Sequence, residues 1–406
     1  MSDFNKVVIM GLGYIGLPTA ALIASKRVAV HGVDVQPKVV EKINKGEIHI
    51  VEPDLDGVVR HVVQNGFLCA ALEPVTADVF IVAVPTPFKN DYEPDISFVE
   101  AATKMVIPHL REGNLFIIES TSPIKTTEKM AELIFEKRPE LKDKIFIAYC
   151  PERVLPGRVL YELENNDRVI GGIDENSTQK AFEFYSMFVK GNLHKSNSRT
   201  AEMCKLVENS YRDVNVAFAN ELSIICEKAD INVWELIKLA NRHPRVKILQ
   251  PGAGVGGHCI AVDPWFIVSD FKNEAKLIRS AREVNNFKSD WVLARIKEAS
   301  CEFEKKNGRK PLIACMGLAF KPDIDDLRES PALHIAEKLH AEKFNMTAVE
   351  PNLKDPRKGL PIADSVEKAV AEADIIAFLV AHKRFKLIAS DTLKNKIVLD
   401  FCGVTN

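Results

Sequence analysis

The sequence of 406 residues predicts an α/β protein in which two doubly wound domains are joined by a helical central domain. Three observations support this fold class. A glycine-rich turn near the start separates a strand-like run from a helical pattern, short apolar runs alternate with helical stretches at both ends, and a long stretch between them contains no strand-like run. Such alternation is typical of parallel sheets covered by helices. Both ends of the chain are therefore expected to be Rossmann-like.

The first domain is expected to begin with a strand, a tight turn and a helix. KVVIM ends at Met10, GLGYIG follows from Gly11 to Gly16, and LPTAALIAS has a helical period. Apolar runs that do not alternate with polar residues indicate strands covered on both faces, which are typical of a parallel sheet. Further runs of this kind lie at residues 28–34, 78–87, 114–123 and 144–153.

The middle of the chain is expected to be helical and its end to be a second, smaller doubly wound domain. From Ser198 the helical period continues well past Asn241 without a strand-like run. Alternation resumes at Pro311, where PLIACMGLAF, MTAVEP, ADIIAFLV and KIVLDF predict strands, and Ser330 with Pro331 predicts the start of a helix. The expected domain boundaries are 1–197, 198–305 and 306–406.

Composition excludes several classes of protein. Because 54 basic residues face 56 acidic ones, no global positive field attracts nucleic acid or anionic lipid. The uncharged stretch at residues 7–25 is interrupted by three glycines and Pro18, so we expect neither a membrane span nor a signal peptide. Eight cysteines without a CxxC pair suggest reduced thiols in the cytoplasm and no structural zinc.

The glycine turn predicts a dinucleotide site. Gly11, Gly13 and Gly16 form GxGxxG, and Asp34 ends the second predicted strand. This arrangement places a pyrophosphate at a helix N-terminus and a carboxylate at the ribose 2′-hydroxyl, which favours NAD over NADP. Thr86 and Thr121 follow later strands at the edge where such sheets bind ligands, although threonine is equally common as a loop residue.

A second glycine-rich segment points to a nucleophile. PGAGVGGHCIAVDP, at residues 251–264, crowds glycines before Cys259 and places Asp263 four residues after it. The glycines indicate a backbone that closely approaches another group. A cysteine held there is a candidate thiolate nucleophile, whereas the alternative is a buried cysteine that acts as a small hydrophobe. His258 has no partners at the spacing of a metal site, so no metal is expected.

One face of the central helix carries polar residues. Lys205, Asn209 and Arg212 lie at i, i+4 and i+7 and therefore share a face. A solvated face is the ordinary explanation for such a triplet. Asparagine is a poor former of mid-helix structure, however, which favours a functional role for Asn209.

These motifs, taken in order, resemble the UDP-glucose/GDP-mannose dehydrogenase family. GLGYIGLPTA, AVPTP, ESTSP, YCPER, the KxxxN of Lys205 and Asn209, GGHCIAVDP and GLAFKPDIDDLRESP carry the resemblance, which extends from end to end. It implies that the three domains bind NAD, dimerise, and bind a UDP-sugar. It also implies oxidation of a sugar C6 alcohol to a carboxylate with two NAD molecules, through a thiohemiacetal and a thioester on Cys259.

The resemblance assigns roles residue by residue. It implies that Lys205 and Asn209 act on the C6 oxygen, that Asp263 and Thr121 position water, and that Glu152 is the base for thioester hydrolysis. It places Gly11, Gly13, Tyr14, Ile15, Gly16, Asp34, Thr86, Thr121, Thr127 and Arg328 at NAD. It places Arg153, Val154, Lys205, Asn209, Arg212, His243, Arg245, Gly256 and Lys321 at the substrate.

Two questions stay open at this point. Many relatives carry a basic residue where this chain has Cys402, so a contact to the substrate or to a neighbouring residue is expected to be missing, and we leave Cys402 outside the site. The identity of the sugar depends on a few contacts around C2 that the sequence does not define. A different class of protein, a nonenzymatic NAD sensor, would have no use for Cys259, Lys205 and Asn209 together.

Overall fold

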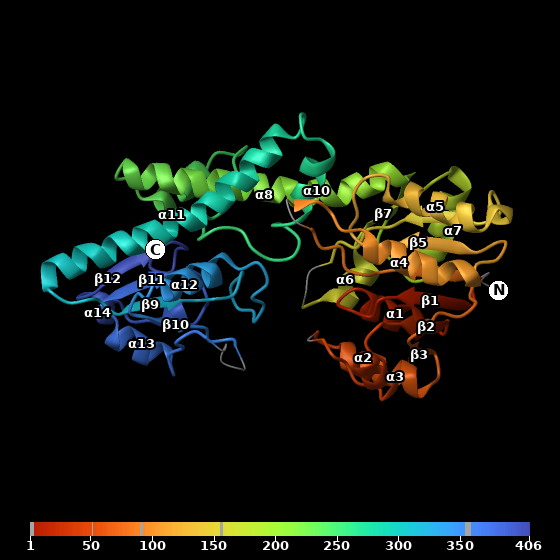
Figure 1. The fold of residues 1–406 in the computed structure, drawn as a ribbon, viewed down its shortest axis with the longest axis horizontal. Coiled ribbons are helices and arrows are strands. Elements are labelled where there is room, and N and C mark those ends of the chain that lie inside the picture. The colour runs from red at the N-terminus through yellow and green to blue at the C-terminus, as the bar shows by residue number, and fades with distance from the viewer. Residues whose placement is uncertain (1–3, 51, 90–91, 155–156, 354–358) are drawn as a thin grey trace. The chain divides into compact units, whose positions relative to one another are not determined.

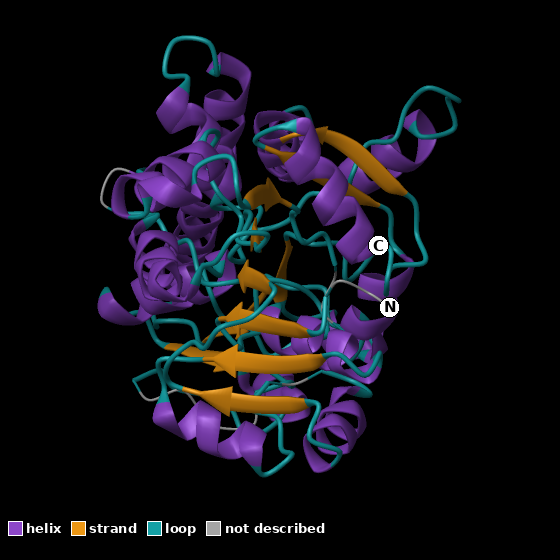
Figure 2. Cartoon of the chain, turned by 90° about the vertical axis from the view of Figure 1, so that its right-hand side faces the viewer, coloured by secondary structure: helices purple, strands orange, loops and turns teal. Residues whose placement is uncertain are grey.

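The computed structural model describes residues 4–50, 52–89, 92–154, 157–353 and 359–406. The chain divides into two compact units, Met1–Glu208 and Asn209–Asn406. Each unit contains a sheet with helices alongside its strands (Figures 1 and 2). The predicted α/β class with two doubly wound sheets is confirmed. The division into three domains at 1–197, 198–305 and 306–406 stays a prediction.

In the described part of the first unit, eight strands form one sheet in the order β3-β2-β1-β4-β5-β6-β7-β8. Neighbouring strands are parallel except β6 and β7, which pair antiparallel. The strand order reverses between β1 and β4, which creates a topological switch point. The strands are β1 (Lys6–Met10), β2 (Ala29–Val33), β3 (Leu68–Ala71), β4 (Val79–Val82), β5 (Leu115–Ile118), β6 (Phe146–Tyr149), β7 (Arg168–Gly172) and β8 (Leu193–Asn197).

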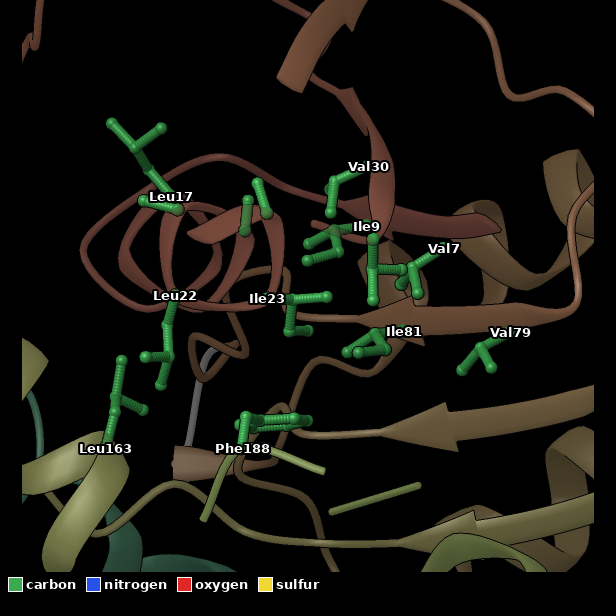
Figure 3. Close-up of a cluster of buried hydrophobic side chains, with 14 of the residues drawn as sticks. Val7, Ile9, Leu17, Leu22, Ile23, Val30, Val79, Ile81, Leu163 and Phe188 are labelled. Atoms are coloured by element: carbon green, nitrogen blue, oxygen red, sulfur yellow. The ribbon is translucent and has the colours of Figure 1, made fainter. Parts of the chain in front are cut away.

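Helices cover both faces of this sheet. Val7 and Ile9 of β1 belong to one hydrophobic core, and Val8 and Met10 belong to the other. Ile23 of α1 packs in the first core beside residues of β1 and β4 (Figure 3). The helices are α1 (Gly16–Ser25), α2 (Pro37–Asn44), α3 (Leu55–Gln64), α4 (Ser97–Val106), α5 (Thr126–Lys137), α6 (Val159–Asn165) and α7 (Glu175–Tyr185), with short 3-10 helices at Ile107–His109 and Pro139–Leu141.

The second unit contains a smaller parallel sheet in the order β10-β9-β11-β12. Its strands are β9 (Ile313–Met316), β10 (Met346–Val349), β11 (Ile375–Phe378) and β12 (Ile397–Asp400). The helix α8 (Ser198–Lys228) begins in the first unit and continues into the second. The other helices are α9 (Val233–Ala240), α10 (Asp263–Asp270), α11 (Lys276–Asn307), α12 (Pro331–Ala341), α13 (Val366–Glu372) and α14 (Ser390–Leu393), with a 3-10 helix at Phe385–Leu387.

The helix start predicted at Ser330 is confirmed. The Ser330 hydroxyl accepts a hydrogen bond of 3.3 Å from the backbone nitrogen of Leu333, and Pro331 is the first helical residue. A hydroxyl in this position satisfies a backbone donor that the helix itself leaves without a partner.

The first turn of the second sheet repeats that of the first. Gly11 has φ +93° and donates from its backbone nitrogen to the Val33 oxygen at 2.8 Å, and Gly317 has φ +97° and donates to the Val349 oxygen at 2.8 Å. In both turns, adding a Cβ would create a contact of 2.5 Å. The two sheets therefore place the same tight glycine turn after their first strand, at their own switch points.

A search of the described residues finds no helix that is long and apolar enough to span a membrane.

Candidate active site

The turn after β1 fits a bound dinucleotide. A Cβ on Gly16 would lie 1.8 Å from the Gly11 carbonyl oxygen, so the helix α1 packs against the turn more closely than any side chain allows. A Cβ on Gly13, in contrast, would meet no described atom within 4 Å. Gly11 and Gly16 therefore shape the turn itself, whereas Gly13 leaves its outer side bare for close approach of a pyrophosphate.

Asp34 connects this turn to the end of β2. Its carboxylate accepts a hydrogen bond of 3.1 Å from the Leu12 backbone nitrogen and one of 2.9 Å from the Gln36 backbone nitrogen. The side chain is only partly buried. The negative charge thus lies at the edge where a ribose 2′-hydroxyl is read in such folds, and where a 2′-phosphate would be repelled.

We expect Asp34→Asn to reduce the preference for NAD over NADP by about tenfold or more, because the amide oxygen still accepts from Leu12 while the charge is lost. Measurement of kcat/KM with each cofactor tests this. Asp78→Asn is the matched control, since Asp78 also accepts hydrogen bonds from two backbone nitrogens, those of Asn5 and Lys6. A ratio that stays the same in Asp34→Asn would exclude the proposed role.

The two threonines predicted from the strand pattern follow neighbouring strands. Thr86 follows β4 and Thr121 follows β5, and both side chains are partly exposed. Ser120 connects the two loops, because its hydroxyl accepts from the Val84 nitrogen at 2.9 Å and donates to the Val84 oxygen at 2.8 Å. Thr86 and Thr121 therefore lie at the same sheet edge as the glycine turn.

The other residues assigned to NAD differ in their accessibility. Tyr14 is 44% exposed, and Ile15 directly precedes α1. Thr127 is fully buried, and its hydroxyl donates to Glu202 at 2.6 Å. Arg328, in the second unit, pairs with Asp326 at 2.6 Å.

Glu202 is a residue that sequence reasoning missed. It is fully buried on α8, and its carboxylate also accepts from the backbone nitrogens of Lys125 and Thr127, at 2.6 and 2.8 Å. It thereby ties the start of α5 to α8 three residues before Lys205. An acidic residue next to the apolar Ala201, just after the first turn of the helix, was the available signal.

Glu152 contacts a buried cluster that contains Arg168, Glu119 and Tyr185. Its Oε2 accepts from Arg168 Nη2 at 3.1 Å, and its Oε1 accepts from the Arg153 backbone nitrogen at 2.6 Å. Arg168 is also 3.7 Å from Glu119, which accepts from the Tyr185 hydroxyl at 2.6 Å. Arg153 pairs with Glu208 at 2.9 Å, and Val154 is partly buried beside it.

Burial raises the pKa of Glu119 to about 7, although the nearby Arg168 opposes the increase. A carboxyl whose pKa is higher in the folded than in the unfolded protein makes the fold less stable as pH rises between those two values. Wild type should therefore lose stability relative to Glu119→Gln from about pH 4.5, its ordinary pKa, to about pH 7. Between pH 4.5 and pH 7, the free energy of unfolding of wild type should fall relative to that of Glu119→Gln by on the order of 3 kcal/mol.

Urea unfolding of both proteins across this range of pH measures the difference. The stability of Glu119→Gln relative to wild type should rise with pH and then stay constant. A difference that does not change with pH would show that Glu119 does not titrate there.

The glycines before Cys259 lie against the protein itself. A Cβ on Gly256 would be 2.4 Å from the Glu329 oxygen, and one on Gly257, at φ +84°, would be 2.8 Å from the Phe320 ring. Gly257 also donates from its backbone to the Arg328 oxygen at 3.1 Å. The predicted close approach is confirmed, and its partner is the loop that follows β9.

Cys259 lies one helical turn before α10. Its backbone oxygen accepts from the Asp263 nitrogen at 2.8 Å, and its side chain is partly exposed. The buried Asp263 carboxylate accepts from Asn209 Nδ2 at 2.5 Å. The structure thus brings together two residues that the sequence separates by 54 positions. Asn209, for which the sequence favoured a functional role, therefore has a specific partner in Asp263, at the end of the loop that carries Cys259.

A buried network fixes the beginning of the same loop. Asn220 on α8 accepts from the Gly252 nitrogen at 2.9 Å and donates to Asn285 on α11 at 2.9 Å. Asn285 donates to Asp213 at 2.8 Å, and Asp213 pairs with Arg282 at 2.7 Å. Helix α8 therefore holds the loop both before and after Cys259.

The remaining residues assigned to the substrate are accessible. Lys205 is partly exposed on α8, and Arg212, His243, Arg245 and Lys321 are exposed. None of these positions is buried, so each side chain is available to a ligand.

A cavity of about 1140 Å³ opens in the second unit. Phe320 and Pro322, which flank Lys321, line it together with Trp234, and Lys238, Lys383 and Lys386 add three cations. Two of the lining segments follow β9 and β11, between which the strand order reverses. Cys402, left outside the predicted site, also lines the cavity. Sequence reasoning missed these three lysines, although the basic run HKRFK, which contains two of them, was a visible signal.

Comparison with known proteins identifies the family. The family's NAD binding domain matches residues 5–189, its central domain residues 199–287 and its UDP binding domain residues 314–406. UDP-N-acetyl-D-mannosamine dehydrogenase of Escherichia coli K12 is 54% identical over 99% of both chains. NDP-N-acetyl-D-galactosaminuronic acid dehydrogenase of Ralstonia nicotianae is 49% identical over 99% of this chain and 96% of that one.

A solved structure agrees with these sequence matches. UDP-D-ManNAc dehydrogenase from Pyrococcus horikoshii superposes with a TM-score of 0.88 and 39% identity, covering 99% of this chain and 96% of that one. The glycine turn with Asp34 lies in the matched NAD binding domain, and the loop of Cys259 lies in the matched central domain. The cavity is lined by residues of both the central and the UDP binding domain. The chain therefore belongs to the UDP-glucose/GDP-mannose dehydrogenase family and is an NAD-dependent nucleotide-sugar dehydrogenase.

Proposed function

We propose that this enzyme oxidises UDP-N-acetyl-D-mannosamine at C6 to UDP-N-acetyl-D-mannosaminuronate. The substrate is supported by the 54% identity to the Escherichia coli dehydrogenase over nearly the whole chain. The observation that carries the chemistry is the placement of Cys259, on a loop fixed at both ends and one turn before the Asp263 that binds Asn209.

A cysteine explains how an alcohol becomes a carboxylate in one site. The conversion removes two hydrides, which NAD accepts when bound. In the first stage, Lys205 takes the proton of the C6 hydroxyl as the aldehyde forms. The Cys259 thiolate then adds to C6, forming a C–S bond, and Asn209 donates a hydrogen bond to the oxygen of the thiohemiacetal.

The second stage ends in hydrolysis. Loss of the second hydride turns the thiohemiacetal into a thioester. Glu152 removes a proton from a water molecule as the water oxygen attacks C6, and Asp263 and Thr121 position this water. The C–S bond then breaks, which releases the carboxylate and returns the Cys259 thiolate.

The cations of the chain provide for the diphosphate of the substrate. Arg153 and Arg212 offer forked donors, and Lys321 offers a point charge beside the cavity of the second unit. His243, Arg245, Gly256 and Val154 complete the proposed substrate contacts. We place the uridine in that cavity, where Lys383 and Lys386 add positive charge.

A different sugar nucleotide is the main alternative. The 49% identity to the Ralstonia nicotianae protein makes a related substrate, with a different arrangement at C2 or C4, one such alternative. UDP-N-acetylglucosamine, UDP-glucose and GDP-mannose are the other candidates. The nonenzymatic NAD sensor no longer stands as an alternative, because the chain belongs to a family of NAD-dependent dehydrogenases.

The decisive experiment counts NADH formed for each sugar nucleotide consumed. UDP-N-acetyl-D-mannosamine is run beside the three alternatives and beside a UDP-N-acetylgalactosamine sample. The proposal requires two NADH per molecule, with the mannosamine sugar preferred. One NADH per molecule would exclude the thioester route, and equal or better turnover of another sugar would change the substrate.

We also propose that the chain forms a homodimer through α8. Tyr211, Phe218 and Ile225 lie seven residues apart on this helix and are 73%, 55% and 56% exposed. A stripe of large apolar side chains at this spacing favours pairing with another helix.

We expect Phe218→Glu combined with Ile225→Glu to convert the dimer to a monomer. Both residues lie in the apolar stripe, and charged side chains there would have to be buried without partners in the dimer. Light scattering after gel filtration measures the mass. Tyr161→Glu, at a tyrosine of α6 that is 57% exposed, is the control. A monomeric wild type, or a dimeric double variant, would contradict the proposal.

We propose finally that the enzyme works in the cytoplasm and supplies a uronate donor for a bacterial surface polysaccharide. The location is supported by eight cysteines that form no disulfide. The role rests on the chemistry of the product, a nucleotide-activated acidic sugar.

A further inference from the structure

The cluster that contacts Glu152 is rich in buried ionisable side chains. Arg168 is 4% exposed, and Glu119 and Glu152 are 2% and 7% exposed. Tyr185 and Cys150 are fully buried against the same guanidinium, with the Cys150 sulfur 3.8 Å from Arg168 Nη1. Replacing such an ionic cluster by apolar residues is often neutral or stabilising, so its presence favours a role in the chemistry.

The two oxygens of Glu152 are held in different ways. Oε2 accepts from the Arg168 guanidinium at 3.1 Å, and Oε1 accepts from the backbone nitrogen of Arg153 at 2.6 Å. These two contacts fix the direction in which the Glu152 side chain points. A general base needs such positioning, because its carboxylate must face the water molecule when water arrives.

Arg168 is itself fixed from the interior. Its side chain is stacked on the Tyr185 ring, 5.1 Å from the centroid, and Nη1 faces Glu119 at 3.7 Å. Glu119 in turn is held by the Tyr185 hydroxyl at 2.6 Å. Burial disfavours the charged form of Arg168, but the surrounding Glu152, Cys150 and Glu119 outweigh it and raise its pKa. The guanidinium therefore stays charged.

We propose that Arg168 is a positioning residue for Glu152 and that its loss specifically slows hydrolysis of the Cys259 thioester. This inference rests on the proposed function, in which Glu152 activates the water of that step. Among the described residues, Arg168 contacts Glu119, Cys150, Glu152, Leu163 and Tyr185, none of which belongs to the glycine turn. The two hydride-transfer stages should therefore proceed largely without it.

Arg168→Met is the direct test, because methionine is apolar and has a long unbranched side chain. Stopped-flow measurement of NADH is combined with intact-mass analysis of the quenched enzyme. The variant should form two NADH per site in a rapid burst and then turn over about a hundredfold more slowly than wild type. The quenched variant should carry the mass of the sugar acyl group, bound at Cys259.

Arg168→Met breaks a buried ion pair and could therefore unfold the protein. Arg168→Lys is a second variant that keeps the test valid in that case. Lysine keeps the charge but not the fork, so the steady rate should lie between those of Arg168→Met and wild type, with a smaller amount of adduct. Arg60→Met is the matched control: it also removes one arginine paired with a carboxylate, that of Asp56, but at an exposed site. It should behave like wild type.

The outcomes separate the two proposals. A wild type that gives two NADH, together with Arg168 variants that slow the burst and the steady rate equally and carry no adduct, would reduce Arg168 to a structural role. Wild-type rates in both variants would exclude any role. A wild type that gives one NADH per sugar would overturn the proposed function and this inference with it.

Discussion

Cys259→Ala should abolish formation of the carboxylate, with a loss of turnover of about a thousandfold or more. In the proposed mechanism this residue supplies the sulfur that keeps the aldehyde bound between the two oxidations, and alanine has no group that adds to a carbonyl carbon. NAD binding should survive, because the glycine turn and Asp34 that fit NAD belong to the other compact unit of the chain. The loop itself should keep its shape, since its fixed points are the backbone at Gly252 and the pair of Asn209 and Asp263.

Two assays are needed for this variant. Carboxylate is measured as the uronate product by mass spectrometry, and NAD binding is measured by calorimetry without substrate. Cys301→Ala is the matched control, because Cys301 is an exposed cysteine of α11 in the same unit. Uronate formed at a normal rate by Cys259→Ala would remove the thioester from the mechanism, and loss of NAD binding would mean that the loop is structural.

Gly16→Ala should eliminate detectable NAD binding and also destabilise the protein. The added Cβ would lie 1.8 Å from the Gly11 carbonyl oxygen, which is a backbone atom that cannot move away without displacing the turn. Gly13→Ala should lose NAD affinity by a different route. Its Cβ meets no described atom within 4 Å, so the fold should be retained while the methyl group occupies the space of the pyrophosphate.

Thermal unfolding and NAD titration of the two variants separate these effects. We expect the melting temperature to fall only in Gly16→Ala. NAD affinity should fall in both variants, by about a hundredfold or more, because the backbone amides of the turn would lose their hydrogen bonds to the phosphate. Gly57→Ala on α3 is the control, since its Cβ also meets nothing within 4 Å. Normal NAD affinity in Gly13→Ala would show that the cofactor does not approach this side of the turn.

Local sequence patterns predicted much of the first unit. KVVIM, the glycine turn and the following helix appear as β1, the turn and α1, and the runs near residues 79, 115 and 146 appear as β4, β5 and β6. These predictions succeed because burial on both faces requires apolar residues at successive positions. The strands β7 and β8 were not predicted. β7 begins with the charged Arg168 and β8 has the sequence LHKSN, so neither is a continuous apolar run.

The antiparallel pairing of β6 with β7 was equally invisible in the sequence. Strand direction depends on how the chain returns after β6, and the apolar pattern of a strand is the same in both directions. The consequence for the site is direct: β7 begins at Arg168, so this return places the guanidinium beneath Glu152.

The sequence by itself determined the fold class, the NAD turn and the family, and it predicted Cys259 as the nucleophile, because each of these depends on residue types at fixed short spacings. Only the tertiary structure decided the partners: Asp263 for Asn209, Glu202 for Thr127, and Arg168 for Glu152. These pairs join residues that lie far apart in the chain, except Glu152 and Arg168, whose sixteen-residue separation is still longer than the three or four residues at which side chains of one helix meet. Desolvation makes such buried groups find partners, but which partner each one finds depends on how strands and helices pack.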